Sequence, residues 1–186
     1  MIIIDKNIHL ARSSVSHAEA LFEAVDRNRA HLSGFLPWVH SMKDIDDLSS
    51  YLAKCNTLIE EGTEISYEII VSNQIVGRIG LHHIDRYNQH ASIGYWLTEQ
   101  AQGRGIIIRA CRRLISYAFD TLHLNRIEIL AAKENIKSQA VPQKLGFTQE
   151  GVLRQVEKVN DKLHDLVVYA VLKEDWDKME NQQHHE

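Results

Sequence analysis

The sequence predicts a mixed α/β sheet with helices packed on its faces. Segments in which apolar residues recur at helical spacing alternate with short runs that are typical of strands. Three such runs follow one another between residues 66 and 97 with only short polar turns between them, as in hairpins. The chain has 186 residues, of which 44% are hydrophobic, and it shows no linker, repeat or low-complexity segment. We therefore expect one domain over residues 1–186 with a substantial core.

In the first half, a strand is expected at residues 8–12, followed by helices at 17–31 and 45–60. Each helix would bury one apolar face, formed by Ala18, Leu21, Phe22 and Val25 in the first and by Leu48, Leu52, Cys55 and Ile59 in the second. Strands at 66–71 and 75–82 flank the polar residues 72–74, which predict a hairpin connection.

In the second half, a strand at 91–97 leads through Gly103 and Gly105 into a helix. The apolar face of this helix consists of Ile107, Cys111, Leu114, Ile115 and Ala118. A strand at 126–131, a short helix at 136–144 and two strands at 153–159 and 163–172 complete the order. Pro142 lies inside the short helix and has no N–H for the carbonyl of Ser138, so it predicts a kink.

Charge and composition argue against several classes of function. The 25 acidic residues outnumber the 21 Lys and Arg residues, whereas nucleic-acid surfaces usually carry a basic excess. The apolar run before Asp5 is too short for a signal peptide, and no segment approaches the length of a membrane span. Cys55 and Cys111 both fall in helical patterns. We expect them to be buried thiols of a protein in a reducing compartment. We expect a cytoplasmic protein that binds neither nucleic acid nor membrane and holds no metal, since the histidines lack a spacing such as H-E-x-x-H.

The turn at Gly103 and Gly105 has the features of an anion site. Glycines allow a sharp turn and a close approach of ligand to backbone, and the free N–H groups of the following helix bind phosphate. Arg104 and Arg109 add positive charge nearby. The spacing is neither the dinucleotide fingerprint nor a P-loop. On local chemistry alone, a phosphate site and a simple tight connection remain equally open.

The segment Gln102-Gly-Arg-Gly105-Ile-Ile107 resembles the Q/R-x-x-G-x-G/A segment of the GNAT N-acetyltransferases, although Ile107 replaces a small residue. Other segments match in the expected order: 36–38, 93–97, 134–138, 144–147, 150–154 and 163–169. Together they resemble the RimJ/RimL-type branch, which acetylates ribosomal-protein N-termini. The resemblance covers nearly the whole chain and is strongest over residues 75–172. It implies a mostly antiparallel sheet, acetyl-CoA as cosubstrate and a homodimer.

The resemblance also implies which residues bind acetyl-CoA. They are Tyr95, Trp96, Leu97, Gln102, Gly103, Arg104, Gly105, Ile106, Ile107 and Asn135. A backbone N–H within residues 95–97 is expected to stabilise the oxyanion of the reaction. Tyr95 and Trp96 must face opposite sides of a strand, so one of them is expected in the core. Asn135 is also a natural helix N-cap, and this role can coexist with a hydrogen bond to the pantetheine arm.

Acetylation of an amine requires removal of a proton, because amines near pH 7 are largely protonated. Glu157 matches the position of the proposed base in RimL-like enzymes, and Ser138 matches the proposed acid. From the residues alone, an exposed strand carboxylate that pairs with Arg154 or Lys158 is the more common role for Glu157. Likewise, a serine such as Ser138 more often bonds backbone at a helix start than donates a proton. Three histidines are expected to border the acceptor side: His82, His83 and His164. Each could carry a proton near neutral pH, although strand histidines more often serve as surface or packing residues.

Two classes of function remain. The first is an N-acetyltransferase acting on a protein N-terminus, a small amine or polyamine, or an amino-acid derivative. The second is a noncatalytic acyl-CoA-binding module, which would have no need of Glu157 and Ser138. The sequence leaves the acceptor open. Asp44, Asp46 and Asp47 could attract a basic protein or a polyamine, or they could form a solvated helix cap.

Overall fold

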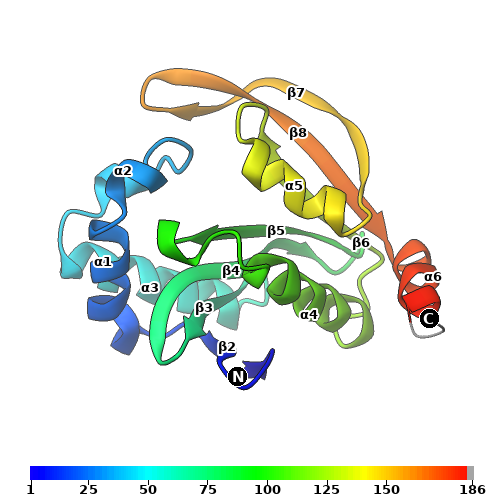
Figure 1. Cartoon of the computed structure of the whole chain (residues 1–186), viewed down its shortest axis with the longest axis horizontal. Helices are drawn as coiled ribbons and strands as arrows, with labels where there is room; N and C mark the ends of the chain where they lie inside the picture. Colours follow the sequence, from blue (N-terminus) through cyan, green and yellow to red (C-terminus); the bar gives the residue numbers. More distant parts are fainter. Residues whose placement is uncertain (184–186) are drawn as a thin grey trace.

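A computed structural model describes residues 1–183 and shows one eight-stranded sheet in the order β1-β2-β3-β4-β5-β6-β8-β7 (Figure 1). Only β5 and β6 pair in parallel; the other neighbouring strands of the described chain are antiparallel. The strands are β1 (Ile2–Ile3), β2 (Ile8–Arg12), β3 (Ile65–Val71), β4 (Gln74–Asp85), β5 (His90–Leu97), β6 (Arg126–Ala132), β7 (Thr148–Val159) and β8 (Lys162–Leu172). The α-helices are α1 (Ala18–Asp26), α2 (Arg29–Leu32), α3 (Ile45–Glu60), α4 (Ile106–Asp120), α5 (Ile136–Lys144) and α6 (Lys173–Gln183). The predicted mixed, mostly antiparallel sheet with helices on both faces is confirmed.

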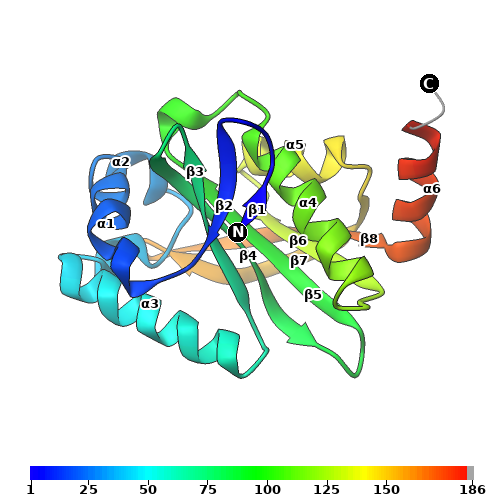
Figure 2. The ribbon, with the colours of Figure 1, turned by 90° about the horizontal axis from the view of Figure 1, so that it is seen from below.

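The helices form two groups (Figure 2). α1, α2 and α3 lie together at one end of the sheet, and α4, α5 and α6 lie toward the other. Leu21 of α1 and Leu48 and Leu52 of α3 pack with the partly buried Trp96 on one face of the sheet. On the other face, Leu114 and Ile115 of α4 are completely buried in the main core. Burial of a side chain of this size stabilises the fold by about 1.5–3 kcal/mol, so the α4 stripe is a major contributor.

The sheet forks between β5 and β6. Pairing joins these strands only from His90 opposite Arg126 to Ser92 opposite Glu128. β6 pairs with β8 along its whole length, from Arg126 to Ala132, whereas the residues of β5 after Ser92 pair only with β4 in the described chain. In Figure 1, β5 and the β6-β8-β7 branch diverge, and α5 lies along the second branch. The last residues of β5 therefore have one backbone edge that is not used by the sheet.

The prediction of one continuous helix over residues 17–31 is wrong, because the structure has two shorter helices there. α1 ends at Asp26 and the short α2 begins at Arg29. Between them the Asn28 side chain donates to the carbonyl of Ala24 (2.8 Å) and accepts from the N–H of Glu99 (3.0 Å). An Asn side chain that bonds backbone competes with helical hydrogen bonds, and here it also fixes the turn that precedes Gly103.

Two elements were not predicted from the sequence. β1 is only two residues long and pairs with β2. α6 is mostly polar, and its buried Trp176 gives too weak an apolar pattern to predict a helix. His184 and His185 of the polar tail lie outside the described residues. No helix within residues 1–183 is long and apolar enough to cross a membrane.

Candidate active site

The turn between β5 and α4 has the backbone of an anion cradle. Gly103 and Gly105 both have left-handed φ angles, +71° and +68°, which residues with a Cβ adopt only with strain. A Cβ added at either glycine would meet no atom of the described chain within 4 Å, so the space above this turn is open. Among residues 1–183 no side chain caps α4 at Gly105. The first N–H groups of α4 are thus available to a phosphate.

The two isoleucines of the cradle contribute backbone rather than side chain. Ile106 is 1% exposed and Ile107 is 8% exposed, and both side chains pack in the main core. The replacement of a small residue by Ile107 therefore fills core space and leaves the backbone approach unaltered. Arg104 is exposed, whereas Arg109 is engaged in an ion pair with Asp5. Backbone hydrogen bonds, first that of Asn7, together with Arg109 lower the pKa of Asp5.

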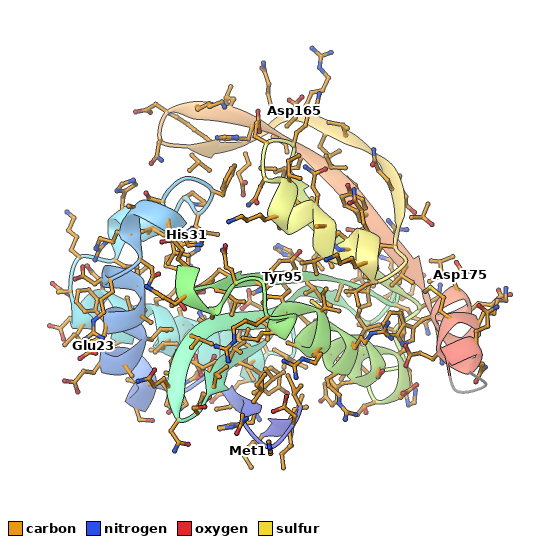
Figure 3. All side chains as sticks on the ribbon, in the orientation of Figure 1. Met1, Glu23, His31, Tyr95, Asp165 and Asp175 are labelled. Atoms are coloured by element: carbon orange, nitrogen blue, oxygen red, sulfur yellow. The ribbon has the colours of Figure 1, made fainter. Side chains whose placement is uncertain are left out.

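Gln102 connects three elements at the mouth of the cradle. Its side-chain nitrogen lies 2.7 Å from Nε2 of His31, and its oxygen accepts from Nζ of Lys137 (3.1 Å). His31 belongs to α2 and Lys137 to the first turn of α5. Figure 3 shows His31 beside α2, Tyr95 at the centre of the molecule and Asp165 on the β7-β8 hairpin, so these elements surround the fork from different sides.

Tyr95 and Trp96 face opposite sides of β5, as predicted. Trp96 packs on the side of α1 and α3, where its ring centroid lies 5.9 Å from that of Trp38. Tyr95 packs with the main core together with Leu97. Trp96 is consequently the member of the pair that belongs to the core on the α1-α3 side, and Tyr95 faces α5.

Pro142 explains how β5 is tied to α5 across the fork. The carbonyl of Ser138, which would accept the N–H of residue 142 in a regular helix, instead accepts the Tyr95 hydroxyl at 2.9 Å. Ser138 Oγ also lies 3.4 Å from the same Tyr95 oxygen. Burial raises the pKa of Tyr95, so its phenol remains protonated and able to donate. The predicted α5 is present from Ile136 to Lys144, and its missing backbone bond positions Tyr95 beside Ser138.

Asn135 is the N-cap of α5. Its side-chain oxygen accepts the N–H of Ser138 at 3.1 Å, which confirms the structural role predicted for it. Asp44 caps α3 in the same way, accepting the N–H of Asp47 at 2.9 Å. The interpretation of this acidic run as a helix cap is confirmed.

A bulge in β7 decides where Glu157 points. Leu153 lies opposite Leu166 and Glu157 lies opposite His164, so residues 154–156 face only Asp165. Gln155 has a left-handed φ of +50°, and its N–H donates to Oδ1 of Asp165 (2.9 Å). In a regular hairpin Gln155 would stand opposite His164. The bulge places the Glu157 carboxylate there instead.

The surroundings of Glu157 favour a protonatable group over a surface ion pair. Its side chain is partly buried, and burial raises the pKa of the carboxyl, an effect that His164 partly offsets. Lys158 pairs with Asp161 at 2.8 Å, and within residues 1–183 no ion pair joins Glu157 to Arg154 or Lys158. The alternative that Glu157 belongs to such a pair is therefore wrong.

Of the three candidate histidines, His164 lies with Glu157. It is 5% exposed, and its Nδ1 lies 3.2 Å from Oε2 of Glu134. The ring also contacts Phe35, with centroids 6.2 Å apart. His82 instead pairs with Glu64 on β3's preceding loop, with 3.2 Å between Nδ1 and Oε1, and His83 lies in the irregular part of β4.

A buried polar cluster supports the α1-α3 side and was missed in the sequence. Glu68 is completely buried and accepts from Ser13 Oγ (2.8 Å), while its other oxygen lies 2.9 Å from Nδ1 of His17. Arg78, opposite both Glu68 and Trp96 in the sheet, donates to the same Ser13 oxygen. Charged residues within the otherwise apolar strands β3 and β4 were the available signal, because buried charges require partners.

Comparison with known proteins identifies the family. Residues 7–148 match the acetyltransferase (GNAT) domain family. The chain is 35% identical to a putative ribosomal N-acetyltransferase of Bacillus subtilis, over 94% of this chain and 96% of the relative. It is 29% identical to the ribosomal-protein-serine acetyltransferase of Escherichia coli, over 90% and 93% of the two chains. A solved structure of RimL, a ribosomal L7/L12 α-N-protein acetyltransferase in complex with coenzyme A, superposes with a TM-score of 0.88 at 30% identity, covering 92% of this chain and 97% of RimL. The chain therefore belongs to the GNAT family of acetyltransferases.

Proposed function

We propose that the protein transfers the acetyl group of acetyl-CoA to a primary amine, and that this amine is the N-terminal α-amine of a ribosomal protein. The observation that carries the proposal is the forked sheet. In one branch, β5 has a free backbone edge and continues into the glycine cradle. The other branch, β6-β8-β7, carries the partly buried Glu157. The names of the Bacillus subtilis and Escherichia coli relatives support a ribosomal acceptor.

The cradle fits the pyrophosphate of acetyl-CoA. The open left-handed turn at Gly103 and Gly105 exposes the first N–H groups of α4, and Gln102 and Arg104 add polar contacts at its rim. Residues 95–97 offer the unused backbone edge of β5 to the pantetheine arm, and Asn135 adds its side-chain amide on the α5 side. The cosubstrate supplies the thioester carbonyl that the amine attacks.

Glu157 acts as the base for the attacking ammonium. Its raised carboxyl pKa makes it a better proton acceptor than an exposed glutamate. The backbone N–H groups of residues 95–97 stabilise the developing oxyanion. Ser138, held near Tyr95, assists as the acid by donating a hydrogen bond to the departing thiolate. This donation is helpful rather than essential, because a thiol with a pKa of about 8.5 leaves readily as the anion.

An assay of thiol release tests the proposal. Acetyl-CoA and a thiol reagent are incubated with the protein, with and without amines from three sets: peptides bearing ribosomal-protein N-termini, polyamines and amino-acid amides. We expect amine-dependent release, greatest with the peptides. Binding of acetyl-CoA without amine-dependent release would instead identify a noncatalytic acyl-CoA-binding module. A preference for polyamines would retain the enzyme and reject the ribosomal acceptor.

We also propose that the protein works in the cytoplasm as a homodimer. The β7-β8 hairpin supports the second part, since it presents large exposed apolar side chains at Val152, Leu153, Val156 and Leu163. Sedimentation equilibrium at micromolar concentration measures the oligomeric state, and a monomer would contradict this part.

A further inference from the structure

We propose that His164 carries the proton accepted by Glu157 to Glu134, which releases it to solvent. This inference rests on the proposed function, because it begins with Glu157 as the base. It assigns a task to a buried histidine that the acetyl transfer itself does not use. His164 acts through Glu157 and does not contact the reacting atoms.

The three side chains lie in sequence from the site to the surface. Glu157 and His164 are directly opposite on β7 and β8, where Cβ atoms of such pairs are about 4.5–5.5 Å apart. His164 is 5% exposed, and its Nδ1 lies 3.2 Å from Oε2 of Glu134. The Glu134 side chain is 48% exposed. A buried imidazole therefore links a partly buried carboxylate to one that water reaches freely.

The 33–38 loop lies over the histidine end of this route. Phe35 covers the His164 ring, and Nδ2 of Asn160 at the hairpin tip donates to the carbonyl of Ser33 at 2.7 Å. Loop and hairpin thus meet over the Glu157-His164 pair.

The charges that face His164 suit proton passage. Glu157 lies on one side and Glu134 on the other, and Nζ of Lys162 lies 3.7 Å from Glu134. The hydrogen bond from His164, with Lys162 as a smaller cause, lowers the pKa of Glu134. Glu134 is therefore ionised at neutral pH and gives up an accepted proton quickly.

The transfer balances without any further reactant. The route uses the tautomer in which His164 donates its Nδ1–H to Glu134 and Nε2 carries the lone pair. Glu157, once protonated by the substrate ammonium, passes that proton to Nε2. The Nδ1 proton moves to Oε2 of Glu134 and then to water, and a tautomer exchange of His164 restores the starting tautomer. One proton enters at Glu157 and one leaves at Glu134.

Buffer rescue distinguishes a proton route from a structural contact. We compare Glu134→Gln, His164→Gln and the parent protein at saturating substrates, first in dilute buffer and then with increasing imidazole. Glu134→Gln keeps a hydrogen-bond acceptor on an exposed side chain, so it retains the fold. Both variants should lose about 10-fold or more in kcat in dilute buffer, and imidazole should restore most of it, because a small base replaces the missing carrier. The matched control is Glu174→Gln on α6. Glu174 is an exposed glutamate that pairs with Lys178, and its replacement should leave kcat unchanged in both buffers.

Two results would overturn the relay. The first is parental kcat in dilute buffer for both variants. The second is a lowered kcat that imidazole does not restore, which would assign His164 and Glu134 to packing and hydrogen bonding alone. Failure of the proposed function is visible separately: if Glu157→Gln turns over like the parent, the base is wrong, whereas a slow Glu157→Gln beside a buffer-independent Glu134→Gln rejects only the relay.

Discussion

The glycine cradle and the surroundings of Glu157 are built in different ways. The cradle takes its shape from consecutive residues, Gln102 to Ile107, whose two left-handed glycines set the backbone. The Glu157 region is assembled from three segments that are distant in sequence: the 33–38 loop with Phe35, the turn after β6 with Glu134, and the β7-β8 hairpin with Glu157 and His164. Local backbone conformation thus governs the proposed cosubstrate side, and long-range side-chain contacts govern the proposed acceptor side. Substitutions should divide accordingly between acetyl-CoA affinity and turnover or acceptor binding.

The largest effect is expected at Glu157. Glu157→Gln should lower kcat by roughly 10²- to 10⁴-fold and leave acetyl-CoA affinity nearly unchanged, because it removes only the base. The rate of the variant should rise more steeply with pH than that of the parent, as free amine replaces ammonium. Parental turnover with an unaltered pH profile would remove Glu157 from the mechanism.

The same variant tests the direction of the pKa shift. Burial raises the Glu157 pKa, so the folded protein binds more protons there than the unfolded chain, and stability falls as pH rises from the unfolded pKa through the folded one. At a pH above both pKa values, the parent is destabilised by the full cost of burying an ionised carboxylate, whereas the neutral Gln side chain of the variant has no such cost. In thermal unfolding, the stability of Glu157→Gln relative to the parent should therefore increase from acidic to neutral pH. A relative stability that decreases over this range would contradict the assigned shift.

The second largest effect is expected at the cradle. Gly105→Val should weaken acetyl-CoA binding by roughly 100-fold or more, because the side chain occupies the open space where backbone meets pyrophosphate. Gly62→Val is a matched control: Gly62 also has a left-handed φ, +75°, and an open Cβ direction, but it follows α3, away from the cradle. Both variants should lose similar stability, about 1–3 kcal/mol, and only the first should lose affinity in a binding titration.

Arg104→Ala sharpens this prediction. If the cradle binds mainly through backbone N–H groups, loss of this exposed side chain should reduce affinity much less than Gly105→Val does. An arginine variant with the greater loss would show that side-chain charge, not backbone conformation, holds the cosubstrate.

A smaller effect is expected where the two branches of the fork meet. Tyr95→Phe removes the donor to the Ser138 carbonyl and should cost about 1–3 kcal/mol in stability and several-fold in kcat. Pro142→Ala supplies a backbone N–H that can reach the same carbonyl. Adding it to Tyr95→Phe should recover stability but not kcat, because the Tyr95 oxygen beside Ser138 is still missing. Additive stability losses in this double-mutant cycle would contradict the link through the carbonyl.

The contrast also explains what the sequence could predict. The glycine turn, α4 with its stripe from Ile107 to Ala118, and the cap at Asn135 follow from local spacing and were predicted within a residue or two. The place of Glu157 opposite His164 depends on a bulge stabilised by Asp165, a residue from the facing strand. Likewise, α1 ends at Asp26 because Asn28 bonds to Glu99, which lies 71 residues away. Contacts of this kind leave no local pattern, so the acceptor side could be predicted only through resemblance.

The smallest effect is expected at the contact that closes the acceptor side. Asn160→Ala removes the hydrogen bond to the Ser33 carbonyl, which lies at the surface and is worth about 0.5–1.5 kcal/mol. Since this bond joins the hairpin tip to the 33–38 loop, its loss should raise KM for the acceptor by a few-fold and leave acetyl-CoA affinity unchanged. Lys158→Ala is a suitable control, because it breaks a neighbouring surface pair with Asp161 that does not reach the loop. Equal KM values for the parent and both variants would show that the hairpin and the loop act independently, and that the acceptor side owes its shape to the Phe35 and His164 contact alone.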